Sequence, residues 1–490
     1  MTTTNSNGDI QAFPPVVSGT TLYDLLRAEQ IHGEEALESL CLLKPNSDPQ
    51  YGTSVPLSNK YIIHSAQVDS EEDLAPLQLE NCSHLLMFFA GPLNVIFLAA
   101  EGGDDTASLS RQSVDRNARR SFGVIQQTQR PNIYTYANIE DFVANHDGSK
   151  IRWGFAMDFA ERLPYLFHPE LVYELNSKRW LAECDLKSAN DRILDCEIDC
   201  KHHQHRTTDH KQRWYHNQSC ETCTAGVRDE VQRVVGILKT RKLPFVLKLT
   251  QSLSSVGTII VKSEEERSDA MEQISQNLAD YLPRITKQNV HLNTTALILS
   301  DFLPGETMAL NFFVRRDGTS IFLGACHQLA TGDSGRQATA ITYADQEKLE
   351  KKFRDMLARI GKVLKDEGYY VKLTRSKGAC GADIMETENG TQNVIDLNVR
   401  TPLSLVLYLL GDHFQQRGLG MSLVYECVML SISRNELEKR FVKEFHEARI
   451  VLLGGTKLGG KDRYGYGMVL AGEDRDAIDE LSDRILKFEL

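Results

Sequence analysis

The sequence predicts a mixed α/β (α+β) protein built from several structural units. Its 490 residues correspond to roughly two to four units at a typical domain size. Short apolar runs alternate with stretches of helical periodicity, which is typical of α/β folds. Two dipeptides, Asp317-Gly318 and Asn389-Gly390, stand between apolar runs and favour β-hairpin turns. The chain is therefore expected to combine helices with both parallel and antiparallel strands.

Composition narrows the class of protein. The 67 acidic and 55 basic residues give a net charge of −12, which argues against a general nucleic-acid or anionic-membrane binder. Residues 1–20 are polar and lack the apolar segment of a signal peptide. The longest apolar stretch, residues 85–100, is interrupted by Gly91-Pro92 and is too short for a membrane span. With ten cysteines and no signal peptide, we expect reduced thiols and a cytoplasmic protein.

The expected elements follow in chain order. Residues 21–167 have α/β character, and residues 168–186 are expected to form one helix with Pro169 near its start. Further strands are expected at 244–250, 258–262, 295–303, 310–316 and 319–329, and helices at 227–242, about 264–282 and about 344–367. Helical stretches follow the second hairpin to about Glu447. The last forty residues are then expected to form a strand, a glycine-rich turn, a second strand and a helix.

The second hairpin carries the strongest chemical signal. A type I′ turn at Asn389-Gly390 places Asp383 directly opposite Asp396. Because side chains alternate along a strand, one face carries polar groups and the other an apolar set. The polar face holds Asp383, Asp396, Asn398 and Arg400, and the apolar face holds Ile384, Ile395, Leu397 and Val399.

Two carboxylates that face each other across a hairpin repel. A bound divalent cation would offset this repulsion, and carboxylate and amide oxygens suit Mg²⁺. The alternative is a solvated polar face on an amphipathic hairpin. The sharp contrast between the two faces favours a Mg²⁺ site at Asp383, Asp396 and Asn398, with Mn²⁺ as an alternative ion.

A second signal lies in "VLKLTQSLSSVGTIIV". Lys248 ends an apolar strand, and Ser254, Ser255 and Gly257 lie in the connection to the next strand. Small residues let backbone N–H groups and hydroxyls turn toward a phosphate, and a lysine adds positive charge. The segment is not a P-loop, and an ordinary turn is the alternative. Combined with the acidic hairpin, it predicts a nucleotide site.

In this order the motifs resemble the ATP-grasp superfamily, and in particular its carboxylate–amine ligases. "SSVG" is similar to the lid loop of D-alanine–D-alanine ligases, and "LILSDFLPGE" resembles the hinge strand. The resemblance spans about residues 173–401. It implies an ATP-grasp fold preceded by a pre-ATP-grasp α/β domain, with a lid subdomain and a small C-terminal extension.

The resemblance also implies roles for individual residues. Lys178 and Lys248 would bind ATP phosphates, and Arg400 would bind the transferred phosphoryl group or the acyl phosphate. The catalytic residues would be Arg400, Asp396 and Asn398. Further nucleotide contacts are implied for the lid loop (Ser254, Ser255, Gly257), for the adenine-binding hinge (Asp301, Phe302, Leu303) and for a ribose-binding acid (Glu306). The metal ligands would be Asp383, Asp396 and Asn398.

The chain departs from the family pattern in two places. Gly381 stands where D-alanine ligases often have a basic residue. Either Arg400, Arg375 or Lys377 would supply that charge, or stabilisation of the transition state would be weaker. The interval between Lys178 and Lys248 is also long for a compact member. The domains implied are a tail (1–20), a pre-ATP-grasp domain (21–170), an ATP-grasp domain (171–415, with a lid at about 225–295 and an insertion at about 190–223) and an extension (416–490).

The insertion is rich in cysteine and histidine. Its 28 residues from Cys196 to Cys223 hold four of the ten cysteines and five of the fourteen histidines. The spacings suit a structural zinc site built from Cys196, Cys200, Cys220 and Cys223, with His205 and His210 as further candidates. A solvated surface loop is the alternative reading.

The resemblance implies an ATP-dependent ligase that joins a small carboxylate to a small amine, two amino acids for example, through an acyl phosphate. The nearest similarity is to amino-acid and peptide ligases of natural-product pathways. A carboxylase, a kinase of the same superfamily and a non-catalytic nucleotide-binding regulator are alternatives. Small molecules, rather than nucleic acid or membrane, are the expected partners, and homodimers are common in similar ligases.

Overall fold

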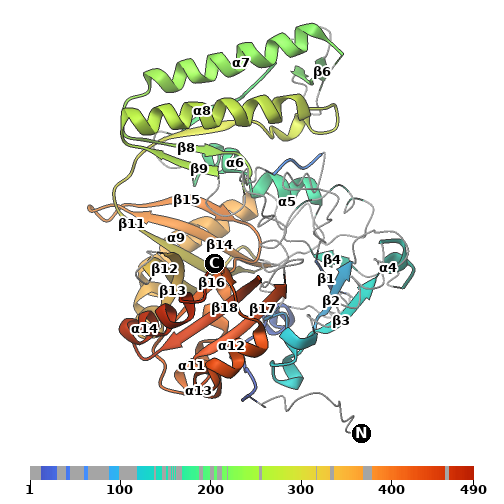
Figure 1. Cartoon of the computed structure of the whole chain (residues 1–490). Helices are drawn as coiled ribbons and strands as arrows, with labels where there is room; N and C mark the ends of the chain where they lie inside the picture. The colour runs from blue at the N-terminus through green and yellow to red at the C-terminus, as the bar shows by residue number, and fades with distance from the viewer. Residues whose placement is uncertain are drawn as a thin grey trace.

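The computed structural model describes residues 13–29, 40–44, 60–63, 88–98, 119–136, 139–145, 150–152, 156, 158, 161, 168–186, 191–198, 204–206, 212–217, 219–252, 257–315, 317–331, 336–367, 378–457 and 463–490. Within these ranges the architecture is mixed α/β, as the sequence predicts. Three sheets of four or more strands and one two-stranded ribbon account for the strands (Figure 1).

The central element is an eight-stranded antiparallel sheet of order β15-β14-β11-β12-β13-β16-β18-β17. Its strands are β11 (Glu306–Val314), β12 (Ser320–Thr331), β13 (Arg336–Thr342), β14 (Gly378–Glu386), β15 (Gln392–Asn398), β16 (Met421–Leu430), β17 (Ile450–Lys457) and β18 (Tyr464–Gly472). The Asp317-Gly318 turn joins β11 to β12, and Gly318 has a φ of +86°, which glycine adopts without a side-chain clash. The first hairpin is therefore confirmed.

Helices cover both faces of this sheet. Helix α9 (Gln346–Asp366) packs its apolar side on one face, in a cluster that includes Phe353, Ile360 and Phe312. Helices α10 (Leu405–Leu409) and α11 (Gly411–Gln415) belong to the core on the other face. The C-terminal strands pack with α12 (Arg434–Arg440), α13 (Val442–His446) and α14 (Arg475–Leu486).

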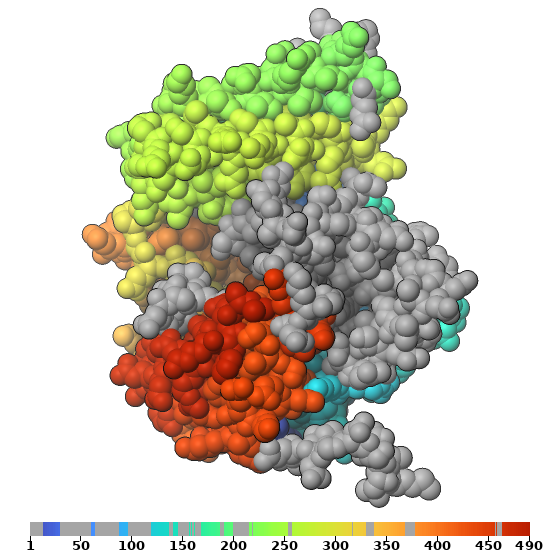
Figure 2. Space-filling view, viewed as in Figure 1, coloured from blue at the N-terminus to red at the C-terminus, as the bar shows by residue number. Residues whose placement is uncertain are grey.

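A second sheet has the order β5-β10-β8-β9. Its strands are β5 (Arg192–Leu194), β8 (Phe245–Leu249), β9 (Thr258–Val261) and β10 (Leu297–Asp301). Helices α7 (Glu221–Thr240) and α8 (Glu264–Tyr281) lie side by side over it and share its core. The turns η6 (Leu282–Arg284) and η7 (Val290–Leu292) follow, and β6 (Gln204–Arg206) pairs with β7 (Gln212–Trp214). In the space-filling view this unit forms one end of the molecule (Figure 2).

The N-terminal residues form a parallel sheet of order β3-β2-β1-β4. Its strands are β1 (Leu40–Lys44), β2 (Asn94–Leu98), β3 (Asn132–Tyr136) and β4 (Lys150–Arg152). Helix α1 (Leu22–Ala28), the turn η3 (Gln127–Gln129) and α4 (Ile139–Asn145) accompany it. Thr21 and Asp24 form a capping box at the start of α1, which satisfies backbone N–H groups that a helix leaves unpaired.

Three expectations need correction. The single helix expected at 168–186 is two helices, α5 (Pro169–Leu175) and α6 (Lys178–Glu183), because the Ser177 side chain accepts a hydrogen bond from the Arg179 N–H and starts a new helix. Residues 421–430, expected to be helical, form β16. Helix α7 begins at Glu221, six residues before the expected start at Val227.

The predicted boundary at residue 415 falls within one continuous structure, because β16, β17 and β18 extend the sheet that holds β14 and β15. The other strands of that sheet come from the segment assigned to the ATP-grasp domain. Across the ranges listed above, the structure contains no helix that is both long and apolar enough to cross a membrane.

Candidate functional site

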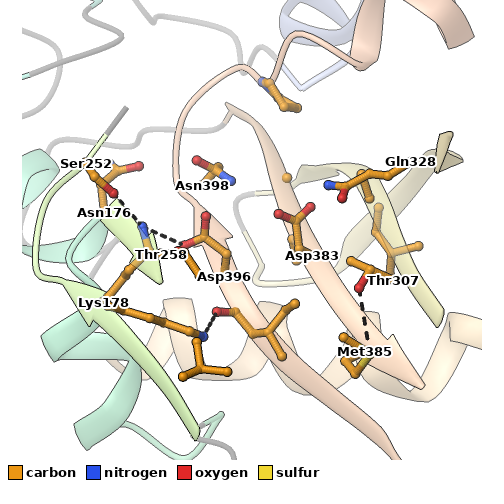
Figure 3. A pocket seen from close by; sticks show the side chains of 18 of the residues that line it. Asn176, Lys178, Ser252, Thr258, Thr307, Gln328, Asp383, Met385, Asp396 and Asn398 are labelled. Atoms are coloured by element: carbon orange, nitrogen blue, oxygen red, sulfur yellow. Dashed lines mark hydrogen bonds and ion pairs between the residues drawn. The ribbon is translucent and has the colours of Figure 1, made fainter. Parts of the chain in front are cut away.

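A cavity of about 540 Å³ lies between the second sheet and the eight-stranded sheet. Figure 3 shows lining side chains from both sheets pointing into it. Nine residues singled out from the sequence line it: Lys178, Lys248, Asp301, Phe302, Leu303, Asp383, Asp396, Asn398 and Arg400. Residues that lie more than 200 positions apart are thus brought to one cleft.

Asp383 and Asp396 face each other across β14 and β15, as predicted. The turn that joins these strands differs from the prediction. Asn389 is not among the residues with positive φ, whereas Gly390 has a φ of +82°. The Thr387 N–H donates to the Thr391 carbonyl at 3.0 Å, so three residues rather than two form the loop, and a type I′ turn is excluded.

A β-bulge restores the register that the longer loop shifts by one residue. Asp383 pairs with Asp396 but Ile384 pairs with Val394, so Ile395 is the extra residue. The prediction that Ile395 lies on the apolar face is therefore wrong: Ile395 lines the cavity, and Val394 takes the core position beside Ile384. Leu397 and Val399 do belong to the core.

The two carboxylates interact strongly. Burial raises the pKa of Asp383, and the charge of Asp396 raises it further, against the opposing effects of Lys178, Lys248 and Arg400. Burial of a carboxyl group next to a second carboxylate opposes its ionisation when no cation is bound. The amide of Asn398 lies in the same cavity, two residues from Asp396. This set of oxygen donors fits a hard divalent cation such as Mg²⁺.

Lys178 is placed by the break between α5 and α6. Its backbone N–H donates to the Thr250 carbonyl at 2.9 Å, which ties the start of α6 to the end of β8. Its side chain is 7% exposed. The Nζ atom lies 3.6 Å from Asp396 Oδ1 and donates to Ser252 Oγ at 3.1 Å. Lys178 therefore connects the acidic hairpin to the connection that follows β8.

Lys248 reaches the same hairpin from β8. Its Nζ donates to the carbonyl oxygen of Ile395 at 2.7 Å, the residue that the bulge turns toward the cavity. Burial lowers the pKa of Lys248, and Asp396 is the largest opposing influence. Both predicted ATP-binding lysines thus hold the acidic hairpin from the side of the second sheet.

The hinge residues follow β10 at the edge of the cavity. Asp301 Oδ1 forms a 2.6 Å ion pair with Arg241 Nη2, and Lys262 Nζ lies 5.0 Å from the centre of the Phe302 ring. Glu306 is exposed and is not among the lining residues. Its neighbour Thr307 lines the cavity instead, because successive residues of β11 point to opposite faces.

The segment after Arg400 is held against the sheet at two points. A Cβ atom on Gly381 would lie 2.9 Å from Pro402 Cβ, so a side chain at position 381 would displace this segment. Ser404 Oγ donates to Asn311 Oδ1 at 2.7 Å. Arg375 and Lys377, the alternative sources of positive charge, lie outside the described residues. Arg400 lines the cavity.

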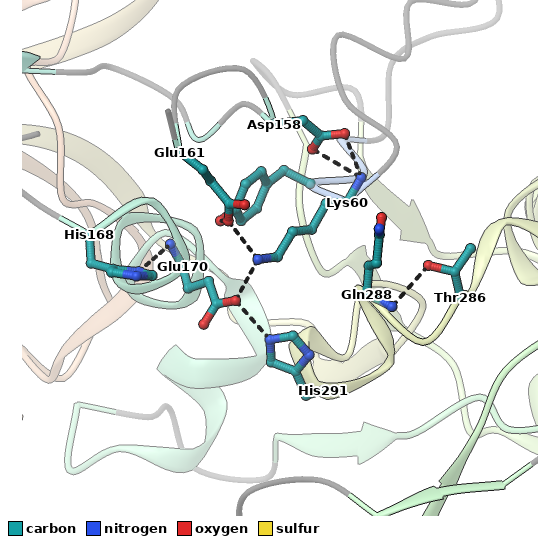
Figure 4. A network of polar contacts seen from close by, with 9 residues as sticks. Lys60, Asp158, Glu161, His168, Glu170, Thr286, Gln288 and His291 are labelled. Atoms are coloured by element: carbon teal, nitrogen blue, oxygen red, sulfur yellow. Dashed lines mark hydrogen bonds and ion pairs between the residues drawn. The ribbon is translucent and has the colours of Figure 1, made fainter. Parts of the chain in front are cut away.

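A polar network fixes the wall formed by residues 60–63 (Figure 4). Lys60 Nζ lies 2.5 Å from Glu161 and 2.6 Å from Glu170, and His291 Nε2 lies 3.0 Å from the same Glu170 oxygen. Hydrogen bonds from His291 and Lys60 hold the pKa of Glu170 at about 2, against the effect of burial. The network links the N-terminal segment to α5 and to η7.

This network extends to the cavity. The Tyr173 hydroxyl donates to the Ile62 carbonyl at 2.5 Å, and Ile63 is a lining residue. The Gln251 side chain donates to the Tyr173 carbonyl, and Gln251 also lines the cavity. Helix α5 therefore positions two parts of the wall at once.

Some predicted residues remain untested. Ser254 and Ser255 lie outside the described residues, while Gly257 is buried against the Ser252 side chain. Cys200 and His210 are also outside, and the described residues contain no group of three metal-ligating side chains. Cys196 and Cys223 are buried in the core under α7, and Cys220 packs against it. The zinc site stays a prediction.

The structure adds residues that sequence reasoning did not find. Gln251, Ser252 and Thr258 line the same cavity as Lys178 and Lys248, and Gln328, Thr339 and Glu426 line it from β12, β13 and β16. The alternation of apolar and polar residues on these strands was available in the sequence. Which strands pair was not, because the pairing of β13 with β16 is non-local.

One known protein family matches part of this chain. Residues 241–375 match a family model described as the ATP-grasp domain. The chain contains an ATP-grasp domain. The matched range includes Lys248 and the hinge, and it ends before the acidic hairpin. A comparison with curated protein sequences gives no match.

Several solved structures are similar to this chain at low identity. The ADP complex of an N5-carboxyaminoimidazole ribonucleotide synthetase is 12% identical, with 84% of this chain and 95% of that chain covered and a TM-score of 0.45. Phosphoribosylamine–glycine ligase from Thermotoga maritima is 11% identical (92% and 96% covered, TM-score 0.46). L-amino acid ligase from Bacillus licheniformis is 11% identical (92% and 97% covered, TM-score 0.45).

Proposed function

We propose that the protein is an ATP-dependent carboxylate–amine ligase that joins two small molecules, two amino acids for example, through an acyl phosphate. The observation that carries this proposal is the pairing of Asp383 with Asp396 in a cavity that also holds Lys178, Lys248 and Arg400. The predicted metal ligands are all present at this site, which argues against a regulatory protein that has lost its catalytic residues.

Different walls of the cavity bind different parts of ATP. Lys178 and Lys248 hold the α- and β-phosphates, because both ammonium groups lie at the acidic hairpin. The backbone of Asp301–Leu303 binds adenine at the hinge. Thr307 takes the ribose contact in this proposal, supported by its place in the cavity lining and by the exposure of Glu306.

Asp383, Asp396 and Asn398 would hold Mg²⁺. When bound, Mg²⁺ neutralises charge on the β- and γ-phosphates. The Lys178 ammonium lies 3.6 Å from Asp396 Oδ1, so it adds a positive charge beside this acidic pair. Arg400 binds the transferred phosphoryl group, and the contact of Ser404 with Asn311 holds its segment in place.

The proposed reaction has two steps. A substrate carboxylate oxygen attacks the γ-phosphorus, and the bond from that phosphorus to the β–γ bridging oxygen breaks to release ADP. The amine nitrogen then attacks the acyl carbon, phosphate leaves, and the nitrogen loses a proton. Positioning and charge neutralisation supply most of the rate in such transfers.

The size of the cavity supports small substrates. Pockets of roughly 300–1,000 Å³ are typical for small-molecule ligands, and this cavity of about 540 Å³ lies in that range. A carboxylase that serves a biotinyl carrier, or a kinase, is the second class of enzyme that this fold allows. Cavity size alone does not separate these from a ligase.

The test is a screen for ADP release over pairs of amino acids and small carboxylic acids, with mass spectrometry of the products. A ligase releases ADP only when carboxylate and amine are both present, and hydroxylamine traps its acyl phosphate as a hydroxamate. ADP release that needs bicarbonate or a single hydroxyl acceptor would instead support a carboxylase or a kinase. Hydrolysis that no pair of substrates stimulates would overturn the proposal.

A further inference from the structure

Three strands of the eight-stranded sheet change from apolar core to polar cavity lining along one face. The change occurs within two residues on each strand. The core members are Cys326 on β12, Ile341 on β13 and Val424 on β16, which share one hydrophobic cluster. The lining members are Gln328, Thr339 and Glu426, which we call the polar floor. Polar groups at the centre of a wide sheet indicate a surface shaped to bind a ligand rather than to pack.

The polar floor is continuous. Gln328 pairs directly with Thr339, and Thr339 pairs with Val424, two residues before Glu426. The pairing of β16 with β18 shifts by one residue between Tyr425 and Val428, so Glu426 lies in a β-bulge. Bulges commonly redirect a side chain next to a functional site.

The charge of the cavity differs between its two parts. The ammonium of Lys178 and that of Lys248 both lie at the acidic hairpin, and Arg400 follows two residues after Asn398. Gln328 lies on the other side of Asp383 from Lys178 (Figure 3). The polar floor contributes an amide, a hydroxyl and the carboxylate of Glu426. A carboxylate in a cleft of reduced dielectric attracts a cation strongly.

We propose that the polar floor binds the amine substrate through a positively charged group, with Glu426 accepting its hydrogen bonds. This inference rests on the proposed ligase function and specifies its amine: a small amine that carries a second cationic group is preferred over an apolar amine of equal size. Glu426 is a specificity-determining residue in this scheme, and the amide of Gln328 orients the same group.

The test measures binding by calorimetry with the full chain, with and without Mg²⁺ and a non-hydrolysable ATP analogue. The two ligands are L-lysine amide and L-2-aminoheptanamide, in which a methyl group replaces the terminal ammonium. We expect L-lysine amide to bind at least about tenfold more tightly, as charge-assisted hydrogen bonds do. Glu426→Gln should remove this difference, and Gln328→Leu should reduce it.

The matched control is Glu388→Gln, which removes an exposed carboxylate from the hairpin loop and should keep the preference. Equal binding of the two amides by the wild-type protein would overturn the inference. So would an unchanged preference in both Glu426→Gln and Gln328→Leu. Failure of the protein to bind the ATP analogue would instead contradict the proposed function. The amine titration without nucleotide measures binding at the polar floor independently of that result.

Discussion

Asp383 stands directly opposite Asp396 on adjacent strands, and the Lys178 ammonium lies 3.6 Å from Asp396. The ion pair therefore belongs to one member of the acidic pair. Asp383 is partly buried and has a raised pKa, because burial and the charge of Asp396 both oppose its ionisation. Such an arrangement is typical of a site where function is favoured over stability.

The first prediction concerns this pair. Asp383→Asn should raise the free energy of unfolding by up to about 1 kcal/mol, because it removes a like-charge contact across the ladder. The same change should lower ATP turnover by roughly 10³-fold or more if Asp383 is a metal ligand. Thermal unfolding and ADP release measure the two effects. Asp396→Asn is the comparison: it should cost similar activity without the gain in stability, because it also loses the contact with Lys178.

The second prediction concerns nucleotide affinity. Lys248→Met should weaken binding of MgATP by about tenfold to a hundredfold, because it removes a buried ammonium that contacts the acidic hairpin. Calorimetric titration with a non-hydrolysable analogue measures this. Lys242→Met, at an exposed position six residues earlier, should leave the affinity unchanged. An affinity that falls equally in both variants would point to a general electrostatic effect instead of a phosphate contact.

The sequence allowed the acidic pair to be predicted for a reason that was only partly right. A two-residue loop and a three-residue loop with a compensating bulge give the same Asp383–Asp396 pairing. Local signals do not separate these solutions, because the bulged residue Ile395 is contacted by Lys248 from another sheet, which a local pattern does not reveal. Lys248 and the hinge were recognisable because they lie on or directly after apolar strands. Lys178 begins the helix α6, and only the family resemblance singled it out. Gln328 and Glu426 could not, since their place depends on which distant strands pair.

The third prediction tests the loop itself. Gly390 has a φ of +82° and nothing within 4 Å of where a Cβ would stand, so Gly390→Ala has a conformational cost without a clash. We expect a loss of about 1 kcal/mol in the free energy of unfolding. Gly236→Ala, in the middle of α7 and equally unobstructed, should instead stabilise by about 0.5–1 kcal/mol. Denaturation curves that moved in the same direction for both variants would contradict the loop geometry.

The fourth prediction concerns the segment that carries Arg400. Ser404 precedes α10, yet its hydroxyl makes no helix cap and donates to the buried Asn311 instead. Ser404→Ala should therefore lower kcat by roughly tenfold through misplacement of the segment, with little change in ATP affinity. Ser404→Thr, which keeps the hydroxyl, should restore part of the rate. Ser431→Ala, at an exposed serine, is the control, and a loss confined to stability would limit Ser404 to a structural role.

The fifth prediction is a pH dependence of stability. His413 is 1% exposed, its Nδ1 accepts the Val17 N–H at 3.3 Å, and burial lowers its pKa to about 4, with Arg417 adding to the effect. The neutral form is therefore favoured by folding. A group with this shift contributes stability above the unfolded pKa near 6.5 and loses it as pH falls toward 4. The difference between pKa values of about 6.5 and about 4 corresponds to roughly 3 kcal/mol in the free energy of unfolding.

Thermal unfolding between pH 7 and pH 4 should show a decline in stability as the pH falls. We expect His413→Gln to make this decline shallower and the exposed His446→Gln to leave it unchanged. An equal dependence of stability on pH in the wild type and in His413→Gln would mean that other groups cause the loss of stability at acid pH.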